Sequence, residues 1–121
     1  MSVLSERIQL VHPNEVATTA PEPGLARQVL AANPKMTLVR HALQAGWTGA
    51  PHSHPHEQLV FVLRGAIEFT AGSQTFIART GDSFIVPGNQ QHQARAFEYS
   101  EVLDVFTPAR EDYANPSNQG S

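Results

Sequence analysis

The stretch that decides the fold is residues 51–58, Pro-His-Ser-His-Pro-His-Glu-Gln. Three of the six histidines of the chain fall within five residues here. Successive side chains of an extended segment alternate between the two faces of a sheet, so His52, His54 and Gln58 are predicted to point into the same space. Imidazole is the commonest metal ligand among protein side chains, and a His-x-His pair at strand spacing is a natural chelate. The stretch therefore predicts a metal site.

A further ligand is expected from a distant part of the chain. His92 follows the turn at 87–89, Pro-Gly-Asn, and opens another β-type segment. The residues after Gln58, Leu-Val-Phe-Val-Leu, are apolar, which indicates that the histidine stretch enters the core. A surface turn rich in proline and histidine is the alternative interpretation of this cluster. We expect a metal cradle in which His92 closes the set of His52, His54 and Gln58.

Other side chains near this stretch compete for the role of ligand. Glu57 is the rival of Gln58, but its parity points it to the opposite face unless a bulge at Pro55 reverses the alternation. His56 has the parity of a ligand but lies between the expected ligands, so we expect it to pack or hydrogen-bond at the rim. The remaining histidines are interpreted as structural: His12 and His41.

The composition is typical of a single globular domain of 121 residues, with 40% hydrophobic and 16% charged residues. The net charge of -3 and the lack of a Lys/Arg cluster argue against nucleic acid as a partner. No apolar run approaches the roughly 20 residues that span a bilayer, so no membrane partner is expected. The N-terminus lacks the layout of a signal peptide, and a cytoplasmic protein is expected. The absence of cysteine excludes disulfides, thiolate metal sites and cysteine nucleophiles.

Short β-type segments separated by Gly and Pro turns predict an all-β sandwich, barrel or jelly roll. The predicted strands are 36–43, 58–63, 66–70, 75–78, 83–86, 92–99 and 101–107. Before them, 8–11 could form an edge strand, 20–24 is expected to be a loop, and 25–32 suits either a helix or a strand. Residues 1–112 are expected to form one domain with its core at about 36–107, followed by a flexible tail over 113–121.

Two motifs resemble those of the cupin superfamily. The first reads Gly46-x5-His52-x-His54-x3-Gln58-x6-Gly65, with Gln where the usual form has Glu. The second reads Gly81-x5-Pro87-Gly88-Asn89-x2-His92, with Asn where Gly is common. The gap of fifteen residues between them is similar to that of small single-domain cupins of the cupin 2 type. The resemblance implies a cupin double-stranded β-helix, or jelly-roll barrel, with His52, His54, Gln58 and His92 around its interior as ligands.

The glutamine in the first motif bears on the chemistry of the site. Three neutral imidazoles and an amide oxygen leave the full charge of a divalent ion uncompensated by protein. This favours a Lewis acid that holds an anionic small molecule, although cupin sites with neutral ligands also serve as oxygenases. We expect one divalent metal ion per chain, and the donor set accepts Ni, Zn, Mn or Fe alike.

The last predicted strand carries a second group of candidate site residues. Val102, Asp104 and Phe106 share one face, and Arg110 follows Pro108. An acid and a guanidinium near a metal would supply a proton-transfer group and a carboxylate clamp, whereas the alternative places both on the solvated surface.

The stretch 103–113, Leu-Asp-Val-Phe-Thr-Pro-Ala-Arg-Glu-Asp-Tyr, resembles the C-terminal signature of the KdgF-type cupins. These are pectin- and alginate-pathway proteins that open the ring of 4,5-unsaturated uronates to linear keto acids. The resemblance implies catalytic roles for Asp104, Phe106 and Arg110. It identifies a subgroup of cupins more surely than it identifies a substrate.

Two other functions stay open at this point. The first is a metal-dependent dioxygenase that acts on an enol-like substrate. The second is a sugar- or metabolite-binding cupin without catalytic activity. In each case a homodimer is expected, with apolar residues of 25–43 at the interface.

Overall fold

The structure is a computed structural model that describes residues 7–114. Nine strands contain more than half of the described residues and the only α-helix among them is one turn long, which confirms the predicted all-β class. The strands are β1 (Thr19–Glu22), β2 (Leu25–Asn33), β3 (Met36–Leu43), β4 (Glu57–Arg64), β5 (Ala66–Ala71), β6 (Gln74–Arg79), β7 (Ser83–Val86), β8 (His92–Ala96) and β9 (Ser100–Thr107). A 3-10 helix (Pro13–Glu15) precedes them, and a short helix, α1 (Glu111–Ala114), follows. No helix in this part of the chain is long and apolar enough to cross a membrane.

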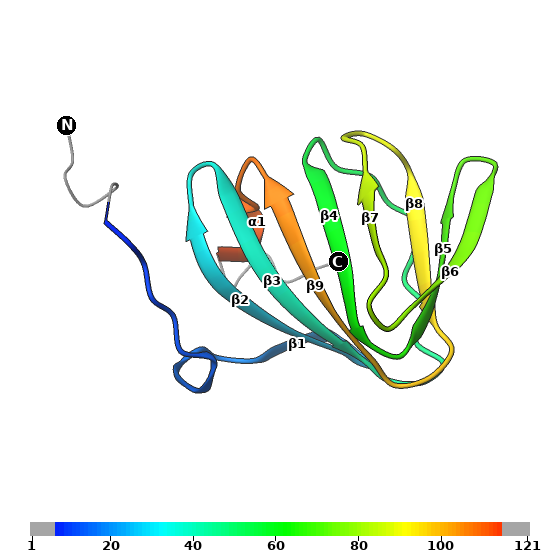
Figure 1. Cartoon of the computed structure of the whole chain (residues 1–121), viewed down its shortest axis with the longest axis horizontal. Coiled ribbons are helices and arrows are strands. Elements are labelled where there is room, and N and C mark those ends of the chain that lie inside the picture. The colour runs from blue at the N-terminus through cyan, green and yellow to red at the C-terminus, as the bar shows by residue number, and fades with distance from the viewer. Residues whose placement is uncertain (1–6, 115–121) are drawn as a thin grey trace.

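The strands form two antiparallel sheets that face each other (Figure 1). The larger sheet has the order β1-β2-β3-β9-β4-β7, and the smaller has the order β6-β5-β8. Strand β9 is the last strand in the sequence, but it lies in the middle of the larger sheet, between β3 and β4. This position places its inward side chains at the centre of the molecule.

Alternating burial defines the interior of the larger sheet. On β9, every second side chain from Ser100 to Phe106 is buried, and on β4 the buried set runs from Gln58 to Val62. Eight buried side chains form the main apolar cluster between the sheets: Leu25, Leu43, Val60, Val62, Ile67, Ala78, Ala96 and Val102. A second cluster contains Val39, Phe106 and Tyr113. The polar residues Gln58 and Asp104 are therefore buried among apolar neighbours.

Gly65 marks the point at which the chain passes from β4 in one sheet to β5 in the other. Its φ of 101° lies in the left-handed region, which favours glycine. A Cβ at this position would lie 2.2 Å from Ser100 Oγ, so no larger residue fits without a shift. The Arg64-Gly65 turn expected from the sequence is thus a crossing between sheets.

The N-terminal third differs from the predictions. The segment 8–11 is not a strand, and the side chains of Ile8 and Leu10 are 99% and 77% exposed. The predicted loop at 20–24 lies largely within β1, because an edge strand tolerates proline. The ambiguous segment 25–32 is a strand, and its pairing with β1 and β3 extends the sheet well before the predicted core.

The C-terminal tail was predicted to start at Tyr113, and this start is wrong. This residue lies in α1, is 8% exposed and packs against Phe106 and Val39. The aromatic ring supplies enough apolar area to hold α1 against the end of the barrel. Residues 115–121, which make up the rest of the predicted tail, lie outside the described residues.

Candidate metal centre

Two segments far apart in the sequence bring three histidines together. His52 and His54 lie in the connection between β3 and β4, and His92 is the first residue of β8. His52 and His92 form reciprocal backbone hydrogen bonds of 3.0 and 2.9 Å, which set their side chains next to each other. The predicted shared direction of His52 and His54 is thus present, although an isolated bridge and a bend at Pro55 produce it in place of a continuous strand.

The three imidazoles present their ligand atoms to one point. One ring nitrogen from each of His52, His54 and His92 lies within 4.8 Å of the other two. Each Nδ1 atom faces a backbone carbonyl at 2.8 to 3.1 Å, and a carbonyl can only accept a hydrogen bond. Nδ1 therefore carries the proton, and the lone pair of each Nε2 atom is available to a metal.

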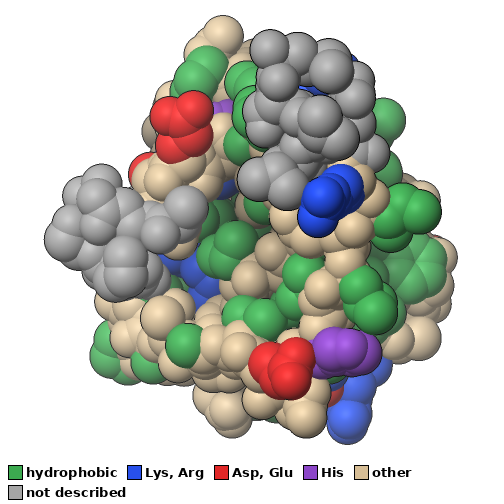
Figure 2. All heavy atoms as spheres, turned by 90° about the vertical axis from the view of Figure 1, so that its left-hand side faces the viewer, with side chains coloured by type: hydrophobic (Ala, Val, Ile, Leu, Met, Phe, Trp, Pro, Cys, Tyr) green, Lys and Arg blue, Asp and Glu red, His purple; other side chains and the backbone are tan. Residues whose placement is uncertain are grey.

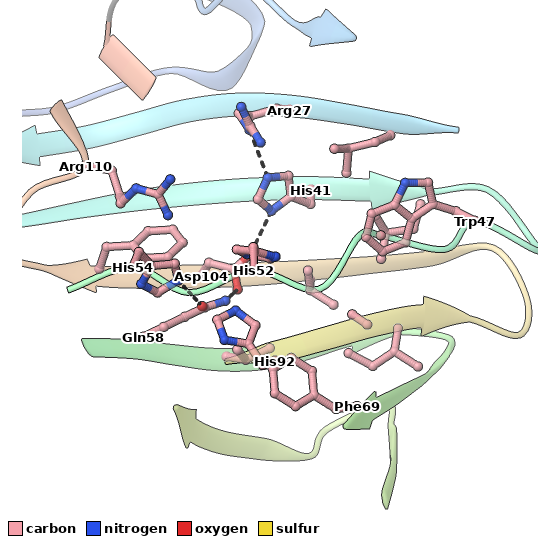
Figure 3. Close-up of a pocket in the computed structure, with 18 of the residues that line it drawn as sticks. Arg27, His41, Trp47, His52, His54, Gln58, Phe69, His92, Asp104 and Arg110 are labelled. Carbon is pink, nitrogen blue, oxygen red and sulfur yellow. Dashed lines mark hydrogen bonds and ion pairs between the residues drawn. The ribbon is translucent and has the colours of Figure 1, made fainter. Parts of the chain in front are cut away.

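The side chain of Gln58 completes the set. Its Nε2 donates a hydrogen bond to Asp104 Oδ1 at 2.8 Å, which directs its Oε1 towards His54 (Figure 3). Oε1 lies 3.1 Å from His54 Nε2, the nitrogen that carries the lone pair. Two acceptor atoms face each other at this distance, an arrangement that a cation between them would stabilise.

Burial favours the neutral state that a metal ligand requires. It lowers the pKa of His54 and of His92 below the ordinary value for histidine. The nearby positive charge of Arg110 acts in the same direction on the pKa of His54. The lowered pKa values favour the neutral form of both rings, which is the form that binds a metal.

These residues fit a divalent ion. Three imidazole nitrogens and one amide oxygen are donors that first-row metals accept. The donors already converge, because the histidine ligand atoms lie within 4.8 Å of one another and Gln58 Oε1 lies 3.1 Å from that of His54. The ion would supply a Lewis acid for oxygen atoms of a bound substrate.

A chain of hydrogen bonds leads from Gln58 away from the histidines (Figure 3). Asp104 accepts from Gln58 through Oδ1 and contacts His41 Nδ1 through Oδ2 at 2.7 Å. Arg27 Nε donates to His41 Nε2 at 3.0 Å, and a guanidinium cannot accept a hydrogen bond. His41 therefore carries its proton on Nδ1 and donates it to Asp104. The carboxylate is thereby held as the acceptor of two hydrogen bonds.

His41 and Arg27 were missed as site residues by the sequence analysis, which interpreted His41 as structural. A signal was present, because both share the inward parity of apolar neighbours on their strands, Leu43 and Leu25. A charged or polar residue at an inward position between apolar ones calls for a buried partner. The sequence did not reveal the partner of His41, since Asp104 lies about sixty residues further along the chain.

Arg110 is held in place by a bidentate ion pair. Its Nε and Nη2 donate to Asp112 at 2.9 and 2.7 Å, and these hydrogen bonds lower the pKa of Asp112. The guanidinium carbon lies 4.8 Å from the ring centroid of Phe106 and 3.9 Å from that of Tyr113. The side chain is 6% exposed, which excludes the alternative of a surface charge.

A cavity of about 100 Å³ joins these groups and has room for a small molecule only. It is lined by every predicted metal ligand and catalytic residue: His52, His54, Gln58, His92, Asp104, Phe106 and Arg110. On the side of the molecule that faces left in Figure 1, hydrophobic and basic side chains are visible inside a hollow (Figure 2). The catalytic roles of the lining residues stay predictions.

The other candidates lie away from this cavity or at its edge. Glu57 is exposed, as its parity predicted, and His12 is also exposed. His56 is half-buried with its ring centroid 5.6 Å from that of His54, in agreement with the expected place at the rim. Neither Glu57 nor His12 contributes to the cavity lining.

Comparison with known proteins assigns this arrangement to a family. The Cupin domain family matches residues 39–106, which include both histidine motifs. The chain is a cupin. The facing antiparallel sheets are accordingly the cupin double-stranded β-helix, or jelly roll, that the motifs implied.

Relatives of this cupin place it near KdgF proteins. It is 29% identical over 92 residues to the pectin degradation protein KdgF of Dickeya dadantii (strain 3937), which is 74% of this chain and 84% of that protein. The structure of KdgF from a Halomonas species has a TM-score of 0.83 at 31% identity, over 88% of this chain and 99% of the other. An RmlC-like cupin from Shewanella frigidimarina NCIMB 400 has a TM-score of 0.80 at 29% identity, over 84% and 92%. The chain is therefore a KdgF-like cupin.

Proposed function

We propose that this cupin is a metal-dependent enzyme that opens the ring of 4,5-unsaturated uronates to linear keto acids. The observation that carries the proposal is the carboxylate of Asp104, which lines the cavity and is hydrogen-bonded to the predicted ligand Gln58. The likeness to a pectin degradation protein supports a sugar acid as the substrate class. One divalent ion of Ni, Zn, Mn or Fe, held by His52, His54, Gln58 and His92, would act as a Lewis acid on substrate oxygens.

Asp104 is proposed to move a proton between two positions of the substrate. As a carboxylate it takes the proton of the anomeric hydroxyl group while the bond between C1 and the ring oxygen breaks. The products of this step are an aldehyde at C1 and an enolate at C5. Asp104 then returns the proton at C4, and the enolate becomes a ketone. The reaction is an isomerisation, so it needs neither an oxidant nor a co-substrate.

Arg110 and Phe106 are proposed to bind and orient the substrate. Arg110 lines the cavity and carries the charge that a uronate carboxylate would pair with. Phe106 is 2% exposed, packs edge-on against His54 and forms part of the apolar wall. A wall of this kind excludes water and restricts the substrate to a reactive orientation.

The proposal is tested with the metal-loaded protein and a 4,5-unsaturated galacturonate. Ring opening removes the ultraviolet absorbance of the double bond conjugated to the carboxylate, and NMR identifies the keto acid. After subtraction of the spontaneous reaction, the rate of Asp104→Asn is expected to be about 100-fold or more below that of the wild type. Full activity in this variant would remove the role of Asp104, and a wild-type rate equal to the spontaneous one would refute the function.

The three-histidine ligand set is also compatible with one alternative, a dioxygenase that acts on an enol-like substrate. Oxygen consumption separates the two functions, because ring opening requires no oxygen. A ligand that is recovered unchanged after long incubation, with neither reaction observed, would support a sugar-binding cupin instead.

A further inference from the structure

Two buried guanidinium groups line the same cavity, each with one buried nitrogen that lacks a partner. Among residues 7–114, Arg27 Nη1 and Arg110 Nη1 are buried side-chain atoms without a hydrogen bond. The side chains are 3% and 6% exposed. A buried charged donor without an acceptor is strongly destabilising, and native proteins rarely retain one without a functional reason.

The remaining contacts of each arginine leave that nitrogen for a ligand. Arg27 uses Nε to donate to His41, whereas Arg110 uses Nε and Nη2 to hold Asp112. Within the described residues, Arg27 takes part in none of the ion pairs. Its positive charge is therefore not compensated by direct contact with an acid.

Tyr113 fixes the two groups relative to each other. The guanidinium carbons of Arg27 and Arg110 lie 3.8 and 3.9 Å from the centroid of its ring. Cation–π contacts of this length hold both groups against the same aromatic ring although they come from β2 and from the segment after β9. The two guanidinium carbons are therefore no more than 7.7 Å apart. In Figure 3 they lie on the opposite side of Asp104 from His92.

The charges in this part of the cavity favour an anion. The charge of Asp112 is paired with Arg110, and the two oxygens of Asp104 already accept hydrogen bonds from His41 and Gln58. Arg27 therefore adds a positive charge that no lining residue neutralises by contact. An anion that accepts from both Nη1 atoms would satisfy the two unpartnered donors at once.

We propose that Arg27 and Arg110 form an arginine clamp that binds one carboxylate of the substrate, with one oxygen on each guanidinium. The inference rests on the proposed function, and it makes Arg27 a substrate-binding residue that distinguishes a uronate from a neutral sugar. The clamp holds the carboxylate away from the metal ligands. The ring oxygen and hydroxyl groups of the sugar are thereby directed towards Asp104.

Binding without reaction tests the clamp separately from catalysis. The probes are a saturated uronate, which cannot undergo ring opening, and its methyl ester, both titrated calorimetrically into the metal-loaded protein. The wild-type protein is expected to bind the acid at least about tenfold more tightly than the ester, because hydrogen bonds between charged groups contribute more free energy than those to a neutral ester. Arg27→Gln is expected to lose most of this preference because the affinity for the acid falls much more than the affinity for the ester.

The matched control is Arg79→Gln, which removes the same charge at an exposed position on β6. His41→Phe tests whether loss of the Arg27–His41 hydrogen bond alone explains the result, and it is expected to keep the preference for the acid. If Arg27→Gln does not fold, Arg27→Lys is measured in its place, and a reduced preference is expected because an ammonium lacks the planar fork.

Each outcome separates the clamp from the proposed reaction. An undiminished preference for the acid in Arg27→Gln, or in Arg27→Lys where that variant replaces it, would overturn the clamp even if the wild-type enzyme opens unsaturated uronates. Equal binding of acid and ester by the wild-type protein would also overturn it. A preference that depends on Arg27, found in a protein without ring-opening activity, would support the clamp and refute the proposed reaction.

Discussion

Gln58 Nε2 donates a hydrogen bond of 2.8 Å to Asp104 Oδ1 and so joins the predicted metal ligand to the predicted proton-transfer group. This contact requires an amide at position 58, because a carboxylate has no donor. It also decides which atom of Gln58 faces the histidines. The glutamine that departs from the usual first cupin motif is therefore matched to the acid on β9.

Gln58→Glu should reduce stability and activity although it restores the usual residue of the motif. Two carboxylates would then face each other in a buried site, and sharing a proton would raise the pKa of one of them. We expect the free energy of unfolding of the metal-free protein to fall by about 2–4 kcal/mol at neutral pH and less at acid pH. Chemical denaturation checks this, with the exposed Glu57→Gln as a control. Unchanged stability and rate would contradict the role of the hydrogen bond.

His41 is expected to act as a positioning residue for Asp104. His41→Phe removes the donor to Oδ2 and should lower kcat by about 10- to 100-fold with a smaller effect on KM. His41→Asn retains an amide that can take the place of Nδ1, and it should recover part of kcat. Steady-state kinetics of both variants check the prediction. Equal losses in the two variants would indicate a packing role for the ring.

The stability of the metal-free protein should depend on pH through His54 and His92. Burial lowers the pKa of both histidines in the folded state, so the unfolded chain binds more protons below its own pKa of about 6.5. The free energy of unfolding is expected to fall as the pH decreases through this region, by at most about 1.4 kcal/mol per pH unit for each group. Denaturant titrations at several pH values measure the slope. His92→Gln should make it shallower, and a slope unchanged by this variant would contradict the assignment.

Homodimerisation stays a prediction, but the structure favours a different surface for the dimer interface from the one expected from the sequence. Leu25 and Leu43, at the ends of the segment assigned to the interface, are buried in the core. The outer face of β4 and β7 instead exposes apolar side chains, among them Phe61 at 41% and Ile85 at 61%. Two copies of this face could cover each other in a two-fold dimer. Phe61→Glu is expected to shift the wild-type dimer to a monomer in light scattering, whereas a monomeric wild-type protein would refute the dimer.

The sequence predicted the β class and the site lining because both depend on local patterns. The alternation of β9 places Asp104 and Phe106 on the inner face, and the spacing of His52, His54 and Gln58 brings them together even though a bend interrupts the strand. At the bend at Pro55 the backbone is not extended, but the side chains before and after it still point to the same place. Motif spacing therefore predicted the site better than it predicted the local backbone.

The parts that were missed depend on contacts between distant strands. Arg27 and His41 enter the site because β2 pairs with β3, and β3 with β9, in a register that no local pattern reveals. Tyr113 belongs to the core because α1 folds back onto the end of the barrel, whereas its polar neighbours made it look like part of a tail. Pairing of this kind is set by the whole fold and cannot be read from one segment.

The central claim is that His52, His54, Gln58 and His92 bind a divalent ion, and metal analysis tests it most directly. Purified protein is stripped with a chelator, offered Mn, Fe, Ni or Zn, freed of excess metal and analysed by mass spectrometry. The account predicts one ion per chain in the wild-type protein and a large loss in His92→Ala, with binding retained in the control His12→Ala. A wild-type protein that takes up none of these ions, or a His92→Ala variant that binds as much metal as the wild type, would contradict it.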